Sequence, residues 1–164
     1  MHFNTRYLET EKSWFGGGMD ITPCLPFLEE KDYHVELKKM CDQHNDNYYP
    51  KFKKWCDEYF YLPHRNEPRG IGGIFFDNLN NNNWNKDFDF IKDVGSFFNN
   101  YATHIINKYK DKSWNNEEKE IQLKKRSRYA EFNLLHDRGT RFGLETGGNI
   151  DAILMSMPPQ ASWD

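Results

Sequence analysis

The sequence predicts a domain of the α+β class. Its first residues alternate between apolar and polar side chains over 2–8, and the apolar run Ile74 to Phe76 follows a pair of glycines, so both segments are predicted strands. A long helix is predicted over 87–109, where apolar residues recur at spacings of three and four. Because strands and helices alternate irregularly, a doubly wound parallel sheet is not expected.

The composition indicates a soluble chain with an aromatic core. Its 164 residues fit one domain, and 16% of them are aromatic while only 37% are hydrophobic. No apolar run approaches the roughly 20 residues of a membrane helix, and the first residues show no charged signal region. The net charge of −3 argues against bulk nucleic-acid binding, although the basic segments 51–54 and 123–128 would suit a small anion. The three cysteines match no metal or disulfide spacing and are predicted to be reduced thiols.

Three further helices and several irregular segments are predicted. A helix over 29–43 would bury Tyr33, Leu37, Met40 and Cys41, a shorter one follows Pro50, and another covers 116–125. The glycines of 14–20 predict an extended or bulged segment that a ligand can approach closely, and the asparagines of 80–83 predict a loop. The tail over 128–159 is predicted to form two or three strands, joined by hairpin turns at DRGT and TGGN.

The charged residues beside glycine predict a site for an acidic ligand. Nucleotide-binding, nucleophile-elbow and HExxH motifs are absent from the sequence, so a metal site would need histidines that converge from distant positions. Arg6, Asp20 and Arg69 each lie on or next to a segment whose backbone is bare. An arginine fork donates two hydrogen bonds to a carboxylate and stays charged at any working pH.

Each of these residues also has a simpler structural interpretation. Arg65, Glu67 and Arg69 can form a local ion pair on a loop, worth about 0–1 kcal/mol if exposed. Asp20 can cap a turn, and a histidine on an alternating strand, such as His2, is often a surface or packed residue. From the residues alone, the prediction stops at an acidic-ligand site of unknown use.

Four separate blocks of the sequence resemble the oxygen-dependent coproporphyrinogen III oxidases. The most specific lies within 54–77 and contains HRNEPRGIGGIFFD. The others are HFNTRYLE, SWFGGGMDITP, and the tail with EFNLLHDRGTRFGLETGG and AILMSMPP, which together cover nearly the whole chain. The resemblance implies a large antiparallel β-sheet covered by α-helices on its faces.

The resemblance also implies a reaction. Enzymes of this family decarboxylate two propionates of coproporphyrinogen III oxidatively to vinyl groups, giving protoporphyrinogen IX for haem synthesis. Dioxygen is the oxidant and no cofactor is implied, because the electron-rich pyrroles can themselves react with oxygen once an N–H bond is weakened. The expected partners are this substrate, O2 and a second copy of the chain in a homodimer, with neither nucleic acid nor a membrane span.

Roles for single residues follow from the same resemblance. His2 matches the proton donor, Asp20 the residue that holds the pyrrole N–H groups and acts as base, and Arg6 and Arg69 the arginines of the pocket. The implied substrate-binding residues are Asn4, Thr5, Arg6, Gly147, Gly148 and Asn149. The tail over 128–163 and the block around His64 match the part associated with dimer formation, which implicates His64, Tyr129, Glu131, Asn133 and Leu135.

The sequence departs from the family pattern in two respects. Family members have a further portion before the position of Met1, so this chain is expected to be the C-terminal portion of such a domain, with an incomplete sheet. Some members have an arginine at the position of Asn149, so one anchor for a carboxylate would be weaker here, by about 1.5–3 kcal/mol for a charge-assisted bond.

Two alternatives and the location stay open. The chain can be a tetrapyrrole-binding or dimerising fragment without turnover, or part of a metal-dependent oxidase that uses His2, His34 and His64. A cytoplasmic location is expected, with the mitochondrial intermembrane space as the alternative, because relatives occur in both.

Overall fold

The computed structural model describes residues 1–163. Contacts within the chain divide it into two compact units. The first comprises 1–23, 27–61 and 70–112, and the second comprises 24–26, 62–69 and the described residues from 113 onward. Helices and an antiparallel sheet make up the chain, so the predicted α+β class is confirmed. The assignment of the whole chain to a single domain stays a prediction.

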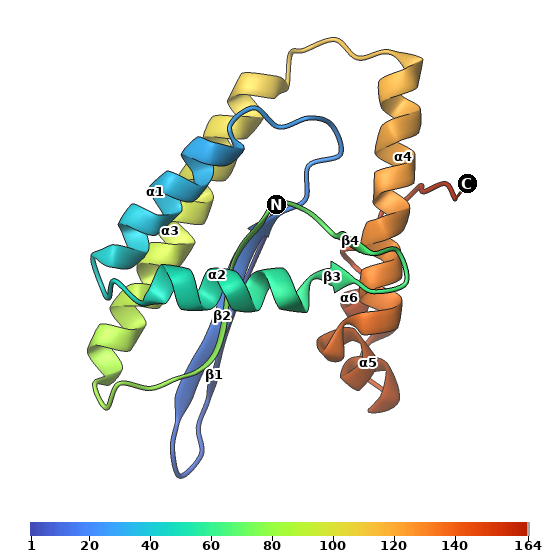
Figure 1. The fold of residues 1–164 in the computed structure, drawn as a ribbon. Helices are drawn as coiled ribbons and strands as arrows, with labels where there is room; N and C mark the ends of the chain where they lie inside the picture. The colour runs from blue at the N-terminus through green and yellow to red at the C-terminus, as the bar shows by residue number, and fades with distance from the viewer. Residues whose placement is uncertain (164) are drawn as a thin grey trace. The chain divides into compact units, whose positions relative to one another are not determined.

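The first unit contains a three-stranded antiparallel sheet. Its strands are β1 (His2–Leu8), β2 (Trp14–Ile21) and β5 (Gly72–Leu79), in the order β1-β2-β5 (Figure 1). All three coincide with predicted extended segments, and the register shifts between Phe15 and Gly17, where the glycines predicted a bulge. The middle strand β2 therefore lies between its two neighbours over most of its length.

Opposite residues in an antiparallel pair share a face, so the register divides the sheet into an apolar and a polar side. Phe3 pairs with Met19 and Met19 with Ile74, and this face is buried. On the other face, His2 pairs with Asp20, while Gly16 and Gly18 lie opposite Arg6 and Asn4. The second face therefore carries the polar side chains of β1 and β2, together with the buried ring of Phe75 opposite Gly18.

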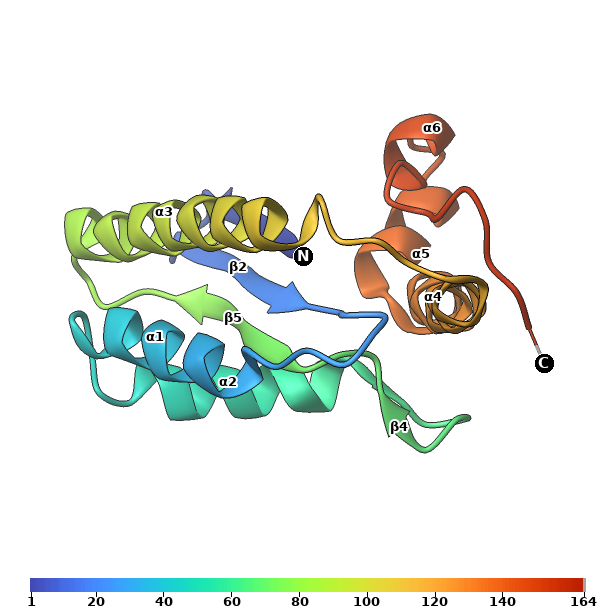
Figure 2. The same ribbon diagram turned by 90° about the horizontal axis from the view of Figure 1, so that it is seen from above.

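Three helices cover the apolar face. They are α1 (Glu30–Asp42), α2 (Tyr48–Tyr59) and α3 (Trp84–Tyr109). Figure 2 shows α3 on the side of β2, and α1 and α2 on the side of β5. Phe76 of β5 makes ring contacts with Phe52 at 5.0 Å and with Phe90 at 5.3 Å between centroids. Replacing such a ring by alanine typically costs about 3–5 kcal/mol, so these contacts fix the sheet against its helices.

The predicted helices of this unit are confirmed, with shifts at their first residues. α1 buries Tyr33, Leu37, Met40 and Cys41, the four residues of the predicted stripe. α2 begins at Tyr48, before Pro50, because proline is tolerated in the first turn of a helix. α3 begins at Trp84, because the side chain of Asn83 accepts a hydrogen bond from the Lys86 backbone N–H at 3.1 Å. The asparagine loop therefore ends in a helix cap.

The second unit is mainly helical. It contains α4 (Asn116–Glu131), the π-helical turn η1 (Phe132–His136), α5 (Arg138–Glu145) and α6 (Ile150–Ile153). A short ladder of β3 (Tyr61–Leu62) and β4 (Glu67–Pro68) precedes Arg69 along the chain. α4 starts with a capping box, in which Asn115 and Glu118 each accept a backbone hydrogen bond at 2.9 Å. The helix continues to Glu131, beyond its predicted end at Lys125.

The predicted strands of the tail are wrong. Residues 128–153 are largely helical, and the two expected hairpin turns are helix caps instead. The Asp137 side chain accepts from the Thr140 backbone N–H at 2.6 Å and starts α5. At the other end, the Gly147 N–H donates to the Leu144 carbonyl and the Gly148 N–H to the Gly143 carbonyl, with Gly147 at φ 72°. This is a Schellman ending, which uses the same glycines that a hairpin turn would use.

Within residues 1–163, no helix combines the length and the apolar character needed to cross a membrane.

Candidate active site

The polar face of the sheet brings together His2 and Asp20. They are opposite each other on β1 and β2, and His2 Nδ1 lies 3.4 Å from Asp20 Oδ1. Asp20 is only 4% exposed, whereas the His2 side chain is 42% exposed. A buried carboxylate beside a more exposed imidazole gives a proton a short path between a protected and an open position. The alternative that Asp20 merely caps a turn is wrong, because it lies within strand β2.

Arg6 lies on the same face and is oriented by its neighbours. Its Nη2 donates to Asp77 Oδ1, its Nη1 lies 3.5 Å from Asn4 Oδ1, and its guanidinium lies 5.7 Å from the ring centroid of Phe75. A β-carbon on Gly16 would collide with Asp77 Oδ1, so only glycine leaves room for this ion pair. The guanidinium is thus held in one orientation above β2.

On the polar face of the sheet, the middle strand β2 carries few side chains. Gly16, Gly18 and Asp20 share the polar face of β2, and Gly73 lies opposite Asp20 on β5. Glycines allow the backbone to be approached closely by a flat or bulky group. Thr5 pairs with Gly17 and belongs to the opposite face from Asn4 and Arg6. Asn4, Thr5 and Arg6 were predicted to bind substrate together. The side chains of Asn4 and Arg6 lie on the face of the candidate site, whereas that of Thr5 does not.

Tyr33 approaches the candidate site from the helical side. Its hydroxyl would be 2.7 Å from a β-carbon on Gly73, and it makes no hydrogen bond within the described part of the chain. Burial, and secondarily the negative charge of Asp20, raise the pKa of Tyr33 well above its usual range. The phenol is therefore neutral at physiological pH. No pattern in the sequence distinguishes it from the other residues of the α1 stripe.

Arg69 belongs to the second unit, where it packs against aromatic rings. Its guanidinium lies 5.0 Å from the ring centroid of Tyr129 and 4.8 Å from that of Phe132. The simpler interpretation placed Arg65, Glu67 and Arg69 in a local ion pair, but Arg65 and Glu67 have charged partners on α4. Arg65 pairs with Glu131 at 2.6 Å, and Arg128 donates to Glu67 at 3.1 Å. Each of these charges finds its partner on α4 because the helix is longer than predicted.

Glu131 is the centre of a charged cluster in the second unit. Its carboxylate accepts from His64 at 2.7 Å, from Arg65 at 2.6 and 3.0 Å and from the Trp163 indole at 2.8 Å. These bonds, above all those from Arg65, lower the pKa of Glu131 to about 2 although burial opposes the shift. His64 also contacts His136, at 3.0 Å between ring nitrogens. Glu131 is therefore satisfied within its own chain.

The other residues predicted for a dimer interface differ in exposure. Asn133 is buried and donates to the Tyr129 carbonyl at 2.9 Å, whereas Leu135 is 56% exposed. Of these two residues, only the exposed Leu135 presents apolar area to a partner.

The predicted substrate segment of the tail forms the connection between α5 and α6. Gly147 and Gly148 end α5, and a β-carbon on Gly147 would meet nothing within 4 Å. Asn149 starts α6, because its side chain accepts from the Ala152 backbone N–H at 3.1 Å. An amide at this position thus has a structural use in capping a helix.

The histidines suggested as metal ligands have other contacts. His34 Nε2 lies 3.0 Å from the Ile71 carbonyl and its Nδ1 lies 3.1 Å from the Tyr49 hydroxyl. The carbonyl can only accept, so Nε2 carries the proton and Nδ1 accepts from the phenol. Burial lowers the pKa of His34, consistent with a neutral ring. Among residues 1–163 no cluster of three or more His, Cys, Asp or Glu side chains is arranged to hold a metal ion.

The fold and the site together define an α+β protein with a helix-covered sheet, one face of which carries a histidine, an arginine and a buried aspartate beside glycines. A family model described as coproporphyrinogen III oxidase matches residues 1–164. The chain therefore belongs to the coproporphyrinogen III oxidase family.

Curated relatives agree with this assignment. The chain is 56% identical over 164 residues to an oxygen-dependent coproporphyrinogen-III oxidase of Rickettsia bellii (strain OSU 85-389), which covers 99% of the chain and 59% of that protein. The proteins of the same name from Rickettsia rickettsii (strain Sheila Smith) and Rickettsia akari (strain Hartford) are 56% and 55% identical over 165 residues, covering 100% of the chain and 59% of each relative. The chain thus spans 59% of the length of these relatives.

Proposed function

We propose that this chain carries part of the active site of an oxygen-dependent coproporphyrinogen III oxidase. In the proposed reaction, two propionates of coproporphyrinogen III become vinyl groups, giving protoporphyrinogen IX. For each propionic acid side chain, one O2 is consumed, and one CO2 and one H2O2 are released. The C–COOH bond and one C–H bond on the neighbouring carbon break, the C=C bond forms, and O2 takes up two electrons together with the proton of that C–H bond and the proton of the carboxyl group. The observation that carries this proposal is the pairing of His2 with buried Asp20 on a glycine-rich sheet face.

The polar face offers groups suited to each part of this substrate. Asp20 can accept from pyrrole N–H groups and take a proton from one of them, and His2 at 3.4 Å can return a proton. Arg6, oriented by Asp77, can donate its remaining N–H groups to a propionate. Gly16 leaves room for the Arg6–Asp77 pair on the same strand face as Asp20, so the groups proposed to bind the propionate and the pyrrole N–H share one face of β2. The substrate itself supplies the electrons, so no cofactor is part of the proposal.

Residues of the second unit complete the proposal. Arg69 and the segment Gly147 to Asn149 are proposed as further substrate contacts, on the basis of the family pattern. The exposed leucines of η1, Leu134 and Leu135, are proposed to take part in a homodimer. Homologues from bacteria support a cytoplasmic location for the protein.

The test is the reaction of the full-length protein with coproporphyrinogen III in air. Protoporphyrinogen is expected, and it is measured as fluorescent porphyrin after oxidation. Asp20→Asn keeps the size of the side chain but removes the base, so kcat should fall by about 100-fold or more. Asp89→Asn, on the exposed side of α3, is the matched control and should leave kcat unchanged.

Two results would contradict the proposal. An Asp20→Asn variant as active as the control would remove the catalytic assignment. Substrate binding without product by the full-length protein would instead favour the alternative of a tetrapyrrole-binding protein without turnover.

A further inference from the structure

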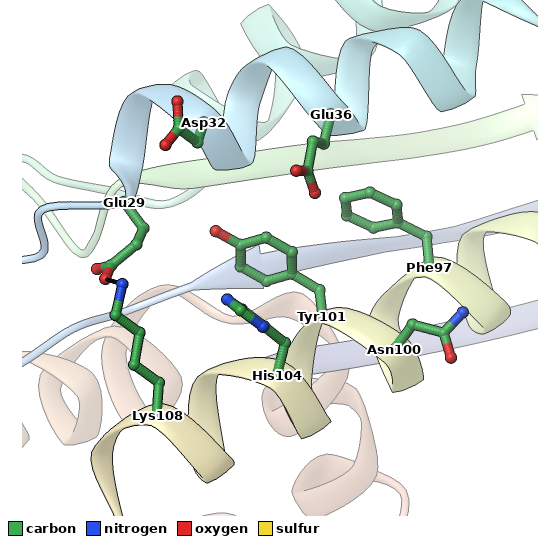
Figure 3. A pocket seen from close by; sticks show the side chains of 8 residues that line it. All are labelled: Glu29, Asp32, Glu36, Phe97, Asn100, Tyr101, His104 and Lys108. Atoms are coloured by element: carbon green, nitrogen blue, oxygen red, sulfur yellow. Dashed lines mark ion pairs between the residues drawn. The ribbon is translucent and has the colours of Figure 1, made fainter.

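A pocket lies between α1 and α3, on the helical side of the first unit. Its volume is about 340 Å³, and it is lined by Glu29, Asp32, Glu36, Phe97, Asn100, Tyr101, His104 and Lys108 (Figure 3). These helices cover the apolar face of the sheet, so the pocket is separate from the polar face that carries His2 and Asp20. A volume of this size is at the lower end for small-molecule sites, which suits a compact ligand.

The charges of the pocket are not balanced. Glu29 forms an ion pair with Lys108 and accepts from the Tyr109 hydroxyl at 2.7 and 2.8 Å, so one acid and the one lysine neutralise each other. Asp32 and Glu36 are four residues apart on α1 and therefore lie on one face of the helix. Neither carboxylate has an ion pair or a side-chain hydrogen bond within residues 1–163. Two negative charges thus border the pocket.

Tyr101 gives the second, independent indication of a ligand. Its side chain is only 7% exposed, yet its hydroxyl points into the space between the helices and makes no hydrogen bond within the described residues (Figure 3). Burial and the nearby acids raise the pKa of Tyr101 to about 12, so the hydroxyl keeps its proton. The hydroxyl of this buried residue is open to the pocket, where a polar ligand group can form a hydrogen bond with it.

The remaining wall is aromatic. The rings of Phe97 and Tyr101 stack at 5.7 Å with an angle of 10° between their planes. Such ring faces attract organic cations and accept hydrocarbon chains. The carboxylates do not converge as a metal site would require, since no group of three His, Cys, Asp or Glu suited to a metal occurs in the described part of the chain.

We propose that this pocket binds a small organic ammonium ion. Asp32 and Glu36 meet its positive charge, the Tyr101 hydroxyl offers a hydrogen bond, and the ring faces of Phe97 and Tyr101 hold its hydrocarbon part. An alkyl amine or diamine fits this chemistry, whereas a neutral alcohol of the same shape lacks the charge and an anion is repelled.

The probe is 1,4-diaminobutane, titrated into the full-length protein by calorimetry, with 1,4-butanediol as the uncharged probe. The diamine should bind saturably and the diol should not. Because two charge-assisted contacts are lost, Asp32→Asn combined with Glu36→Gln should weaken binding by about tenfold or more. Tyr101→Phe keeps the ring and removes only the hydroxyl, and should weaken binding by about threefold. Circular dichroism verifies that each variant is folded.

The control is Glu30→Gln, which removes one carboxylate from α1 at a residue outside the pocket and is compared with Asp32→Asn and Glu36→Gln as single variants as well as with the double variant. It should change the affinity by less than about twofold, since exposed charges are screened by salt. Equal effects of Glu30→Gln and the double variant would mean that net charge alone attracts the amine, and would overturn the proposal. Absence of binding by the diamine, or equal binding of the diol, would also overturn it. None of these measurements depends on oxidase activity.

Discussion

Asp77 belongs to the candidate site because it orients Arg6, a role that the sequence did not suggest. It holds the Arg6 guanidinium from β5, and Gly16 leaves the space for this contact. Asp77→Asn removes the charge that fixes Arg6, so the arginine fork would sample other orientations. In the full-length protein, KM for coproporphyrinogen III should rise by about tenfold, with a smaller change in kcat.

A rise in KM with a smaller change in kcat is what a residue that positions Arg6 should produce. Asp89→Asn, which removes an exposed carboxylate that pairs with Lys92, should leave KM unchanged. If Asp77→Asn instead lowered kcat with KM unchanged, Asp77 would act on the reacting groups and not through Arg6.

Tyr33 permits a test of the buried hydroxyl next to Gly73. The side chain is fully buried and its hydroxyl has no hydrogen-bond partner in the described residues. Removing an unsatisfied polar atom relieves its desolvation penalty, so Tyr33→Phe should leave the free energy of unfolding unchanged or raise it by up to about 1 kcal/mol. Urea unfolding measures this difference.

Tyr109→Phe is the matched comparison, because its hydroxyl donates to both carboxylate oxygens of Glu29. The free energy of unfolding of this variant should be lower than that of the wild type. A similar loss in Tyr33→Phe would show that an ordered water or another group satisfies the Tyr33 hydroxyl.

At the level of elements, the sequence predicted well the parts whose pattern has one interpretation. The strands around HFNTRYLE and GIFF and the helix α3 follow directly from periodicities of two and of three to four. The prediction for the tail was wrong because its turn-forming residues have two structural interpretations. Asp137 and the pair Gly147 and Gly148 suit a hairpin turn and a helix cap equally well, and only the surrounding packing decides between them.

In the candidate site, too, some residues could be predicted from the sequence and some contacts could not. His2, Asp20 and Arg6 lie beside glycines that are visible in the sequence, and the register of β1 and β2 brings them to one face. The ion pair of Arg6 with Asp77 joins residues 71 positions apart, and the contact of Tyr33 with Gly73 depends on how α1 packs on the sheet. Such long-range contacts leave no local pattern.

The cluster that ties the β3–β4 ladder to α4 predicts a dependence of stability on pH. The pKa of Glu131 is about 2 in the folded chain, below its ordinary value of 4.5. A depressed carboxyl pKa stabilises the fold above the unfolded-state pKa, and this contribution is lost as the pH falls from about 4.5 toward 2. The free energy of unfolding of the wild type should therefore fall more steeply over this range than that of Glu131→Gln.

The comparison is made by urea unfolding at several pH values. At pH 7 Glu131→Gln should be less stable, because the ion pair between Arg65 and the largely buried Glu131 carboxylate is lost. Parallel curves for the two proteins between pH 5 and pH 3 would contradict the assignment of this titration to Glu131.

For the whole molecule, the proposed homodimer can be tested at the exposed apolar side chains of the tail. Leu134 and Leu135 are 50% and 56% exposed on η1, next to the satisfied residues Glu131 and Asn133. If these side chains form part of a contiguous apolar patch, that patch is the kind of surface that contacts another protein. Of the residues predicted for a homodimer, Leu135 is therefore the one expected to contribute most to association.

Leu135→Lys tests this in the full-length protein. A charge placed in an apolar interface must be desolvated, so the dissociation constant of the dimer should rise by about tenfold or more. Ile106→Lys makes the same kind of change at a residue of α3 that is 60% exposed, and should leave association unaffected. Sedimentation velocity over a series of concentrations measures both. If Leu135→Lys sediments like the wild type while Glu131→Gln dissociates, the contact would depend on the charged cluster, and the leucines of η1 would have to be covered by another part of the protein.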